Sequence, residues 1–204
     1  HIRGYAFYNC SSMTYINMSN KVKTIGMYAF YMCSSLTTIT IPSCADAPTS
    51  SGLFGKCSSL KSLIITFSEW HTLEYSTGYT FIWDSLRPQL NNIIIKDGIT
   101  KIGNNAFRDC ISLISIDIPD SITSIEASAF YNCRSLKSFI IPNNITKIEN
   151  SVFYNCSSLE SISFSSQVVS IGEYSYYGCS SLKSLKIPET LTDIGAFSFN
   201  NCFS

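Results

Sequence analysis

The stretch IPDSITSIEASAFYNCRSLKSFIIP (Ile118 to Pro142) decides the fold, because the stretch that overlaps it, IPNNITKIENSVFYNCSSLESISF (Ile141 to Phe164), repeats the same phrase. The cysteines keep one interval: Cys110, Cys133, Cys156, Cys179 and Cys202 lie 23 residues apart, and Cys10 and Cys33 have the same spacing. A fixed period of this length indicates a solenoid, in which each repeat packs only on its neighbours. We therefore expect function on a stacked surface rather than in a cleft.

The unit reads I-P-x-x-I-T-x-I-G-x-x-A-F-x-x-C-x-S-L-x-S-I-x-I-P. Its LxxIxI part places apolar side chains on one side of an extended segment and the x positions on the other. This part begins at Met13, Leu36, Leu60, Leu90, Leu113, Leu136, Leu159 and Leu182. We predict that each of these residues starts one short parallel strand, and that proline closes several of the strands.

The rest of the unit predicts a return segment and a turn. An apolar pair spaced by three, such as Ile122 and Ile125, predicts an extended or irregular return segment. The AFxxC part is too short for more than one helical turn. Its aromatic residues form a column that should fill the core, namely Phe7, Phe30, Phe54, Phe107, Phe130, Phe153, Tyr176 and Phe199. The glycines at Gly26, Gly103, Gly172 and Gly195 read as turn residues.

A period of 23 lies within the range of roughly 20 to 29 that is typical of leucine-rich repeats. The predicted fold is a leucine-rich repeat right-handed solenoid with a parallel β-sheet on the concave face and mostly irregular or short helical turns on the convex side. The strings IGxxAFxxCxSLxxIxIP also resemble the cysteine-containing repeats of the BspA-like surface proteins, over nearly the whole chain. That resemblance implies a surface antigen or adhesin that binds host matrix proteins.

We expect residues 1–204 to form a single leucine-rich repeat domain of about eight to nine repeats, irregular at 43–54 and 66–88. The chain opens on IRGYAFYNC (Ile2 to Cys10) and closes on IGAFSFNNC (Ile194 to Cys202), which are the same part of a repeat. Neither end has a polar capping unit. The chain thus reads as excised from something longer, whose flanks could hold a signal peptide or an anchor. No apolar stretch within it approaches the roughly 18 residues that span a bilayer.

The repeat breaks twice. The first break surrounds SCADAPTSSGLF (Ser43 to Phe54), where Cys44 lies off the cysteine ladder. The second inserts seven residues between Cys57 and Cys110 and replaces a ladder cysteine by Arg87. There, Leu73 is expected to substitute for a core isoleucine, and Phe81 or Trp83 to fill the vacant aromatic position.

The second break also supplies candidate contact residues, namely Trp70, His71, Tyr75 and Tyr79. Exposed tryptophan and tyrosine make good anchors in protein interfaces, and repeat insertions often map to one face. The alternative is that these aromatics form a small satellite cluster that shields a weak repeat. Solvent exposure would separate the two interpretations.

The composition argues against several kinds of chemistry. With 14 basic and 14 acidic residues the net charge is zero, so nucleic acid is not an expected partner. There is no CxxC pair and neither histidine has ligand spacing to a cysteine, so we expect no metal and no cofactor. The stacked cysteines are expected to be buried free thiols, with Cys44 the exception. His71 alone does not make a catalytic triad, and we expect no enzyme.

Outward-facing strand positions form three columns that can be read from the sequence. Most positions carry threonine, serine, asparagine or lysine, but Ile64, Ile94 and Ile140, with Ile114 beside them, are apolar. An apolar patch with a polar rim is typical of a protein-binding site, although isoleucine also suits exposed strands through β-propensity alone. We predict ligand contacts at these isoleucines and at Asp117, with Tyr15 and the insertion aromatics next.

Four NxS/T sequons, at Asn9, Asn17, Asn144 and Asn155, are compatible with secretion without demonstrating it. The predicted function is a non-enzymatic protein-binding or adhesion module on a cell surface or outside the cell. Its expected ligand is an extracellular matrix or host cell-surface protein. The alternative is a structural or assembly scaffold inside the cell, which buried reduced thiols would suit.

Overall fold

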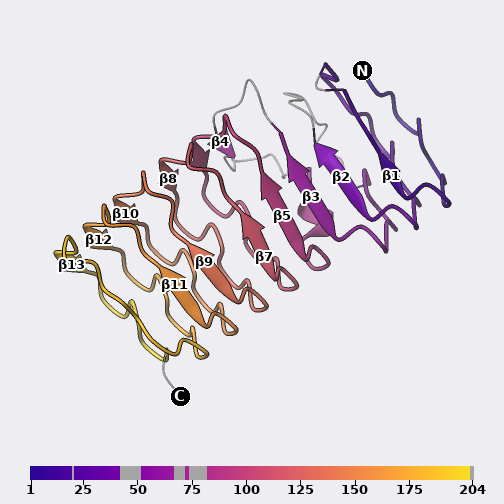
Figure 1. The fold of residues 1–204 in the computed structure, drawn as a ribbon. Helices are drawn as coiled ribbons and strands as arrows, with labels where there is room; N and C mark the ends of the chain where they lie inside the picture. The colour runs from indigo at the N-terminus through magenta and orange to yellow at the C-terminus, as the bar shows by residue number, and fades with distance from the viewer. Residues whose placement is uncertain (20, 42–51, 67–71, 74–81, 203–204) are drawn as a thin grey trace.

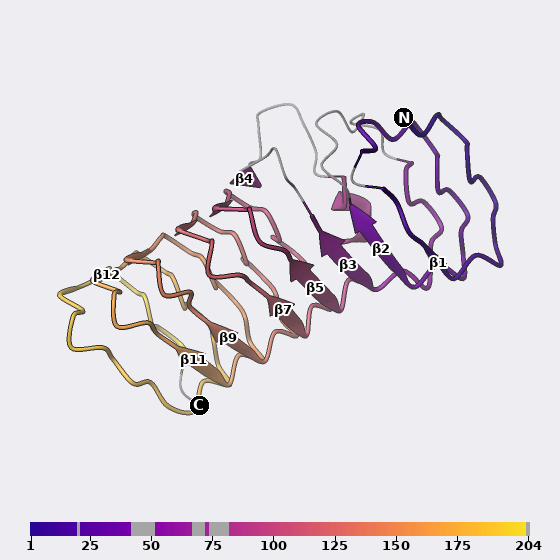
Figure 2. The same cartoon turned by 45° about the horizontal axis from the view of Figure 1, so that its top comes forward.

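The computed structural model describes residues 1–19, 21–41, 52–66, 72–73 and 82–202. The chain winds into a coil whose turns stack side by side, with the two termini at opposite ends (Figure 1). Viewed with its top turned forward, the stack shows successive turns of similar outline (Figure 2). The predicted repeat solenoid with a parallel sheet is confirmed.

The LxxIxI segments form the first row of strands, and we call the outward side of this row the strand face. Its strands are β1 (Tyr15–Ile16), β2 (Thr38–Ile41), β3 (Ser62–Ile65), β5 (Asn92–Ile95), β7 (Ser115–Asp117), β9 (Ser138–Ile140) and β11 (Ser161–Ser163). All pairs are parallel, in one five-stranded sheet from β1 to β7 and a separate pair of β9 with β11. The sheet is therefore interrupted between β7 and β9.

The prediction of a strand after Leu182 is wrong. Residues 183–187 have no strand assignment, and only one backbone hydrogen bond, from Lys183 N to Glu160 O at 3.3 Å, continues the row beyond β11. Phe164 stands at the end of the preceding LxxIxI segment, where most repeats have isoleucine, and its ring packs edge-on against Tyr176. A bulky ring at this position leaves less room for the next segment to approach.

The return segments form a second row of two-residue strands. These are β4 (Thr72–Leu73), β6 (Lys101–Ile102), β8 (Ser124–Ile125), β10 (Lys147–Ile148), β12 (Ser170–Ile171) and β13 (Asp193–Ile194). They pair in parallel as β4-β6-β8 and β10-β12-β13. The strand register pairs Leu73 with Ile102. Leu73 thus has the position in the row at which it was predicted to substitute for a core isoleucine.

The AFxxC segments form tight turns. In the described part of the chain the helical assignment is one 3-10 helix, η1 (Asp84–Leu86). Two residues in a typical turn take left-handed backbone angles, as Ser128 (φ 58°) and Asn132 (φ 62°) do. Asparagine and aspartate tolerate this conformation better than most residues, which explains their frequent position before the cysteine.

The consensus glycines do not supply these turns, which corrects the prediction. A Cβ atom on Gly26 would lie 2.3 Å from the Gly4 nitrogen, and one on Gly195 would lie 2.6 Å from the Glu173 nitrogen. At Gly26 and Gly195 the backbone of the neighbouring turn thus comes too close for a side chain.

An aromatic column runs through the core, as predicted. Adjacent rings stack with centroids 5.1 to 5.8 Å apart, in the pairs Phe7–Phe30, Phe30–Phe54, Trp83–Phe107, Phe107–Phe130, Phe130–Phe153, Phe153–Tyr176 and Tyr176–Phe199. Trp83 fills the position left vacant by the insertion, and its indole nitrogen donates to Ala106 O at 3.1 Å. Phe81, the other candidate, lies outside the described residues.

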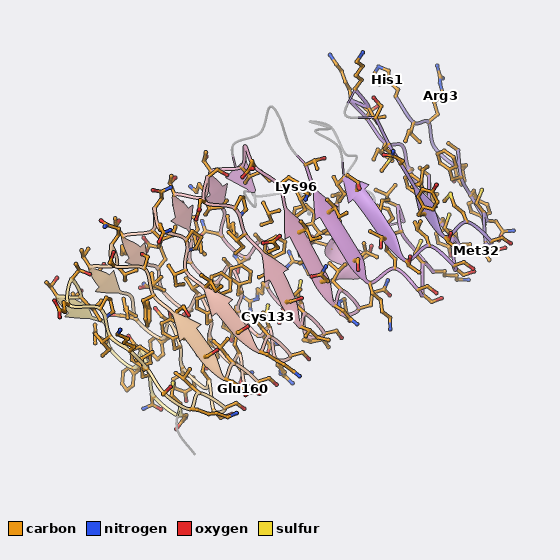
Figure 3. All side chains as sticks on the ribbon, viewed as in Figure 1. His1, Arg3, Met32, Lys96, Cys133 and Glu160 are labelled. Atoms are coloured by element: carbon orange, nitrogen blue, oxygen red, sulfur yellow. The ribbon has the colours of Figure 1, made fainter. Side chains whose placement is uncertain are left out.

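The ladder cysteines are free thiols, as predicted for the eight that the structure describes. Six of them donate a hydrogen bond of 2.9 to 3.2 Å to the carbonyl of the core aromatic residue in the preceding repeat, as Cys133, labelled in Figure 3, does to Phe107. Cysteine therefore combines a small apolar side chain with a donor that satisfies a buried carbonyl. Cys44 lies outside the described residues.

Candidate functional site

The strand face brings two of the predicted contact residues together. In its third outward column the register aligns Thr40 with Ile64, Ile64 with Ile94, and Ile94 with Asp117. Ile64 and Ile94 are both half-buried and lie on neighbouring strands. They form an adjoining apolar pair in this column, with the polar residues Thr40 and Asp117 on either side.

The other isoleucines do not join this step. Ile114 lies in the first column, where its nitrogen bonds to Asn91 O at 2.8 Å and its carbonyl accepts from Lys137 N at 3.4 Å. Asp117 intervenes between Ile94 and the strand that carries Ile140. The predicted patch of four isoleucines is therefore a pair, with two separate residues of which Ile140 is 74% exposed.

Tyr15 projects from β1 at the N-terminal end of the row, where it pairs in register with Thr38 and is 72% exposed. It lies on the strand face but several strands away from Asp117 and Ile140. The remaining predicted contacts, Trp70, His71, Tyr75 and Tyr79, lie outside the described residues.

A groove of about 230 Å³ opens on the strand face at the interruption between β7 and β9. It is lined by Ser115, Ile116, Asp117, Ile118, Asp120, Ser138, Phe139, Ile140, Ile141, Pro142 and Asn143. Asp117 and Ile140, both predicted contacts, thus share one depression. Asp120 was missed because its position in the turn after the strand was not counted among the outward columns.

The groove coincides with a change of residue type on β9. At the fourth residue of the LxxIxI pattern the other repeats have isoleucine or leucine, but β9 has Phe139. Its ring packs edge-on against Phe130 and Phe153, with centroids 5.0 and 4.7 Å away. On the neighbouring strand β7 and just after it, Ile116 and Ile118 are half-buried where their counterparts Ile93 and Ile95 are buried.

The turn side carries a second aromatic column that the sequence reading also missed. Tyr131, Tyr154 and Tyr177 stack with centroids 4.7 and 4.9 Å apart, and the Arg108 guanidinium lies 4.3 Å from the Tyr131 ring centre. Each ring face is thus covered by a neighbour, so this column stabilises the turns. The signal for it was a tyrosine recurring directly after the core aromatic residue.

Arg87, which the alignment placed at the missing ladder cysteine, connects its repeat to the next turn. Its guanidinium bonds to Asp84 Oδ1 at 2.6 Å and donates to the carbonyls of Asn105 and Arg108 in the next turn. Gln89 donates in the other direction, to Cys57 O and Leu60 O at 2.8 Å each. These side chains tie the expanded repeat to both neighbours.

The thiols of Cys57 and Cys133 are poor nucleophiles. Burial raises the pKa of Cys57 to about 11 and that of Cys133 well above its usual value, so both are neutral at physiological pH. Within the described ranges no group of three or more His, Cys, Asp and Glu side chains could hold a metal ion.

The sequons differ in their surroundings. The Asn155 amide donates to Asn132 Oδ1 at 2.9 Å, and Asn132 in turn donates to Asp109 Oδ1 at 2.7 Å. Asn155 is therefore a structural member of a side-chain ladder between turns. Asn17 and Asn144 are exposed.

Comparison with known proteins places the chain in a family. The model of the BspA type leucine-rich repeat region matches in six copies, over residues 1–88 and 79–204. A search of curated proteins found no match. Among the described residues no helix is long and apolar enough to cross a membrane.

Solved structures of leucine-rich repeat proteins are similar to the chain. A leucine-rich repeat protein from Bacteroides ovatus is 26% identical with a TM-score of 0.61, over 98% of this chain and 55% of that one. The chain thus spans about half the length of that protein. The leucine-rich repeat protein of T. pallidum is 21% identical (TM-score 0.49, 90% and 71% covered). A leucine-rich cell surface protein from Faecalibacterium prausnitzii is 26% identical (TM-score 0.44, 98% and 73% covered).

The family match covers the repeats on both sides of the insertion, in agreement with the parallel strand rows, the aromatic column and the cysteine ladder. The chain belongs to the BspA type leucine-rich repeat family.

Proposed function

We propose that the chain is a non-enzymatic module that binds a protein ligand on its strand face, and that it belongs to a larger protein displayed on a cell surface. The adjoining pair of Ile64 and Ile94 carries this proposal. Two branched apolar side chains in register give a flat surface that a partner can cover, and the parallel ladder beneath holds them rigidly.

Family membership supports the same class of function. Leucine-rich repeats are scaffolds that generally mediate protein interactions, and catalysis is not their usual role. Display on a surface and recognition of host or matrix proteins follow from the resemblance to BspA-like surface proteins. They are part of the proposal.

Burial of one isoleucine contributes about 1.5 to 3 kcal/mol when it is complete. Ile64 and Ile94 are already half-buried, so a partner gains only part of that amount from each. Ordering of the partner offsets a further share. The pair is thus suited to an interface of moderate affinity in which polar neighbours such as Thr40 supply the rim.

The test is saturable binding of the folded chain to a panel of purified matrix proteins and to host cell surfaces. We expect the double variant Ile64→Asp/Ile94→Asp to lose binding by tenfold or more, because two charges would enter an apolar contact. Ile111→Asp is the matched control, since Ile111 is exposed outside the strand columns. Binding that survives in a folded double variant would place the contact elsewhere on the molecule. Absence of any binding would favour the intracellular scaffold.

A further inference from the structure

The groove between β7 and β9 has a mixed lining that suits one kind of side chain. Its walls include the half-buried Ile116 and Ile118 and the exposed Ile140, which together with Pro142 are apolar. Two carboxylates, those of Asp117 at the end of β7 and Asp120 in the following turn, also line it. A groove whose lining combines these apolar side chains with two carboxylates is complementary to a cation on a flexible aliphatic stem.

The two carboxylates are available to a partner. Neither the Asp117 nor the Asp120 side chain forms an ion pair or a hydrogen bond with any described residue. Glu160, on the strand face beside β11, is by contrast held by Lys183 from the next repeat at 2.5 Å. The charge of the groove is therefore not neutralised within this part of the chain.

The groove also lies where the strand row is least closed. Between β7 and β9 the chain makes one backbone hydrogen bond, Lys137 N to Ile114 O at 3.4 Å, at the end of the strands away from Asp117. Both carboxylates lie toward the opposite ends of these strands, next to the side chains that Phe139 leaves uncovered. The aliphatic part of a basic side chain can thus lie between the strands while its cationic group reaches the two carboxylates.

We infer that this groove binds a lysine or arginine side chain from an exposed segment of the protein ligand. The methylene stem packs on Ile116, Ile118 and Ile140, and the ammonium or guanidinium group pairs with Asp117 and Asp120. The inference rests on the proposed function, since it names the chemistry that the strand face selects. Ile64 and Ile94 supply apolar area, while the groove selects ligands with a basic residue at the matching position.

The experiment follows the isoleucine methyl signals by NMR while a defined peptide, acetyl-Gly-Ser-Lys-Ser-Gly-amide, is titrated into the folded chain. The same peptide with arginine, norleucine or glutamate in place of lysine provides the comparison, because norleucine keeps the four-carbon stem without the charge. We expect saturable shifts at Ile116, Ile118 and Ile140 with the lysine and arginine peptides. Ile111 should not respond, and the norleucine peptide should bind at least fivefold more weakly.

The matched variants are Asp117→Asn/Asp120→Asn, which removes both charges with little change of shape, and Asp193→Asn, an exposed aspartate on β13. The first should weaken lysine-peptide binding about fivefold, as expected for two exposed ion pairs, and the second should leave it unchanged. Added salt should weaken binding to the unchanged chain and have little effect on the double variant.

The inference is overturned if the lysine peptide gives no saturable shift, if the glutamate peptide gives an equal one, or if the double variant binds as well as the unchanged chain. These outcomes are separate from the proposed function. If Ile64→Asp/Ile94→Asp abolishes binding of a protein ligand but the groove does not bind the lysine peptide, the strand-face proposal stands and this inference is wrong. If the groove binds the lysine peptide but no protein ligand is found, the groove inference stands and the proposed function is wrong.

Discussion

Tyr176 is a tyrosine in an aromatic column whose other members are seven phenylalanines and Trp83. Its hydroxyl is the one buried side-chain polar atom among the described residues without a hydrogen-bond partner. The ring itself is well placed, stacked between Phe153 and Phe199 at 5.2 and 5.1 Å. Burial of the ring therefore stabilises the folded state, whereas burial of the hydroxyl oxygen without a hydrogen bond destabilises it.

Tyr176→Phe should raise the free energy of unfolding by about 1 to 3 kcal/mol, because it removes an unsatisfied donor and keeps the stacking. Urea denaturation followed by circular dichroism measures the change. Tyr177→Phe is the control, since its hydroxyl accepts from Asn201 at 3.2 Å near the surface, and its effect should stay within about 0.5 kcal/mol. A destabilised Tyr176→Phe would show that the hydroxyl has a partner in solution.

The ladder thiols make stability depend on alkaline pH. A cysteine in the unfolded chain ionises near its ordinary pKa of 9.0, whereas burial raises the pKa of Cys57 to about 11. The folded state thus favours the neutral thiol. The resulting stability is fully present below pH 9 and is lost as the pH rises through 11.

We expect the urea midpoint of the unchanged chain to fall between pH 8 and pH 10.5 under reducing conditions. In Cys57→Ala the fall should be smaller, although the variant starts about 1 kcal/mol less stable at pH 8. Lysine and tyrosine also titrate in this range, so the difference between the two chains is the measured quantity. An identical fall in both would mean that Cys57 ionises normally.

At the scale of strands, we expect Phe139, which lies on β9, to cause the interruption between β7 and β9. Phe139→Ile should restore the common residue of this position, close the ladder and cover Ile116 and Ile118. Amide hydrogen exchange at residues 138–140 should slow by tenfold or more, since ladder hydrogen bonds protect amides. Exchange in β2 and β3 provides the internal control, because these strands already pair fully.

The same substitution should shrink the groove and weaken lysine-peptide binding in the NMR titration. If exchange at residues 138–140 is unchanged, the interruption has a cause other than the size of the phenylalanine ring. Slower exchange with unchanged peptide binding would separate the strand opening from the groove.

At the scale of the whole molecule, stability is distributed along the stack, because each turn contacts mainly its neighbours. Phe107 lies in the middle of the aromatic column and is fully buried, with rings stacked on both sides at 5.8 and 5.5 Å. Phe199 lies at the last stacked position and is half-buried.

Phe107→Ala should cost about 3 to 5 kcal/mol at the centre of the stack and split denaturation into two transitions, one for each side. Phe199→Ala should instead leave one main transition and loosen only the last turns. Denaturant melts with exchange measured by mass spectrometry on both halves distinguish these outcomes. A single cooperative loss in Phe107→Ala would show that the two halves unfold together despite the weakened contact.

By itself the sequence determined the period, the alternation of inward and outward residues, and the membership of the aromatic column and cysteine ladder. Local rules suffice for these features, because every repeat meets nearly the same neighbours and a 23-residue period brings equivalent residues together. Even in the remodelled repeat, counting from the strand placed Arg87 at the missing cysteine and narrowed the aromatic position to Phe81 or Trp83.

Only the tertiary structure decided which outward residues adjoin. Ile64 and Ile94 meet because their strands pair, whereas Ile114 lies in another column and Ile140 follows an interruption. The sequence showed Phe139 as an acceptable core residue, but the opening of the ladder depends on how its volume fits between Phe130 and Phe153. The groove and its two free carboxylates result from packing between repeats, and a pattern read within one repeat cannot contain them.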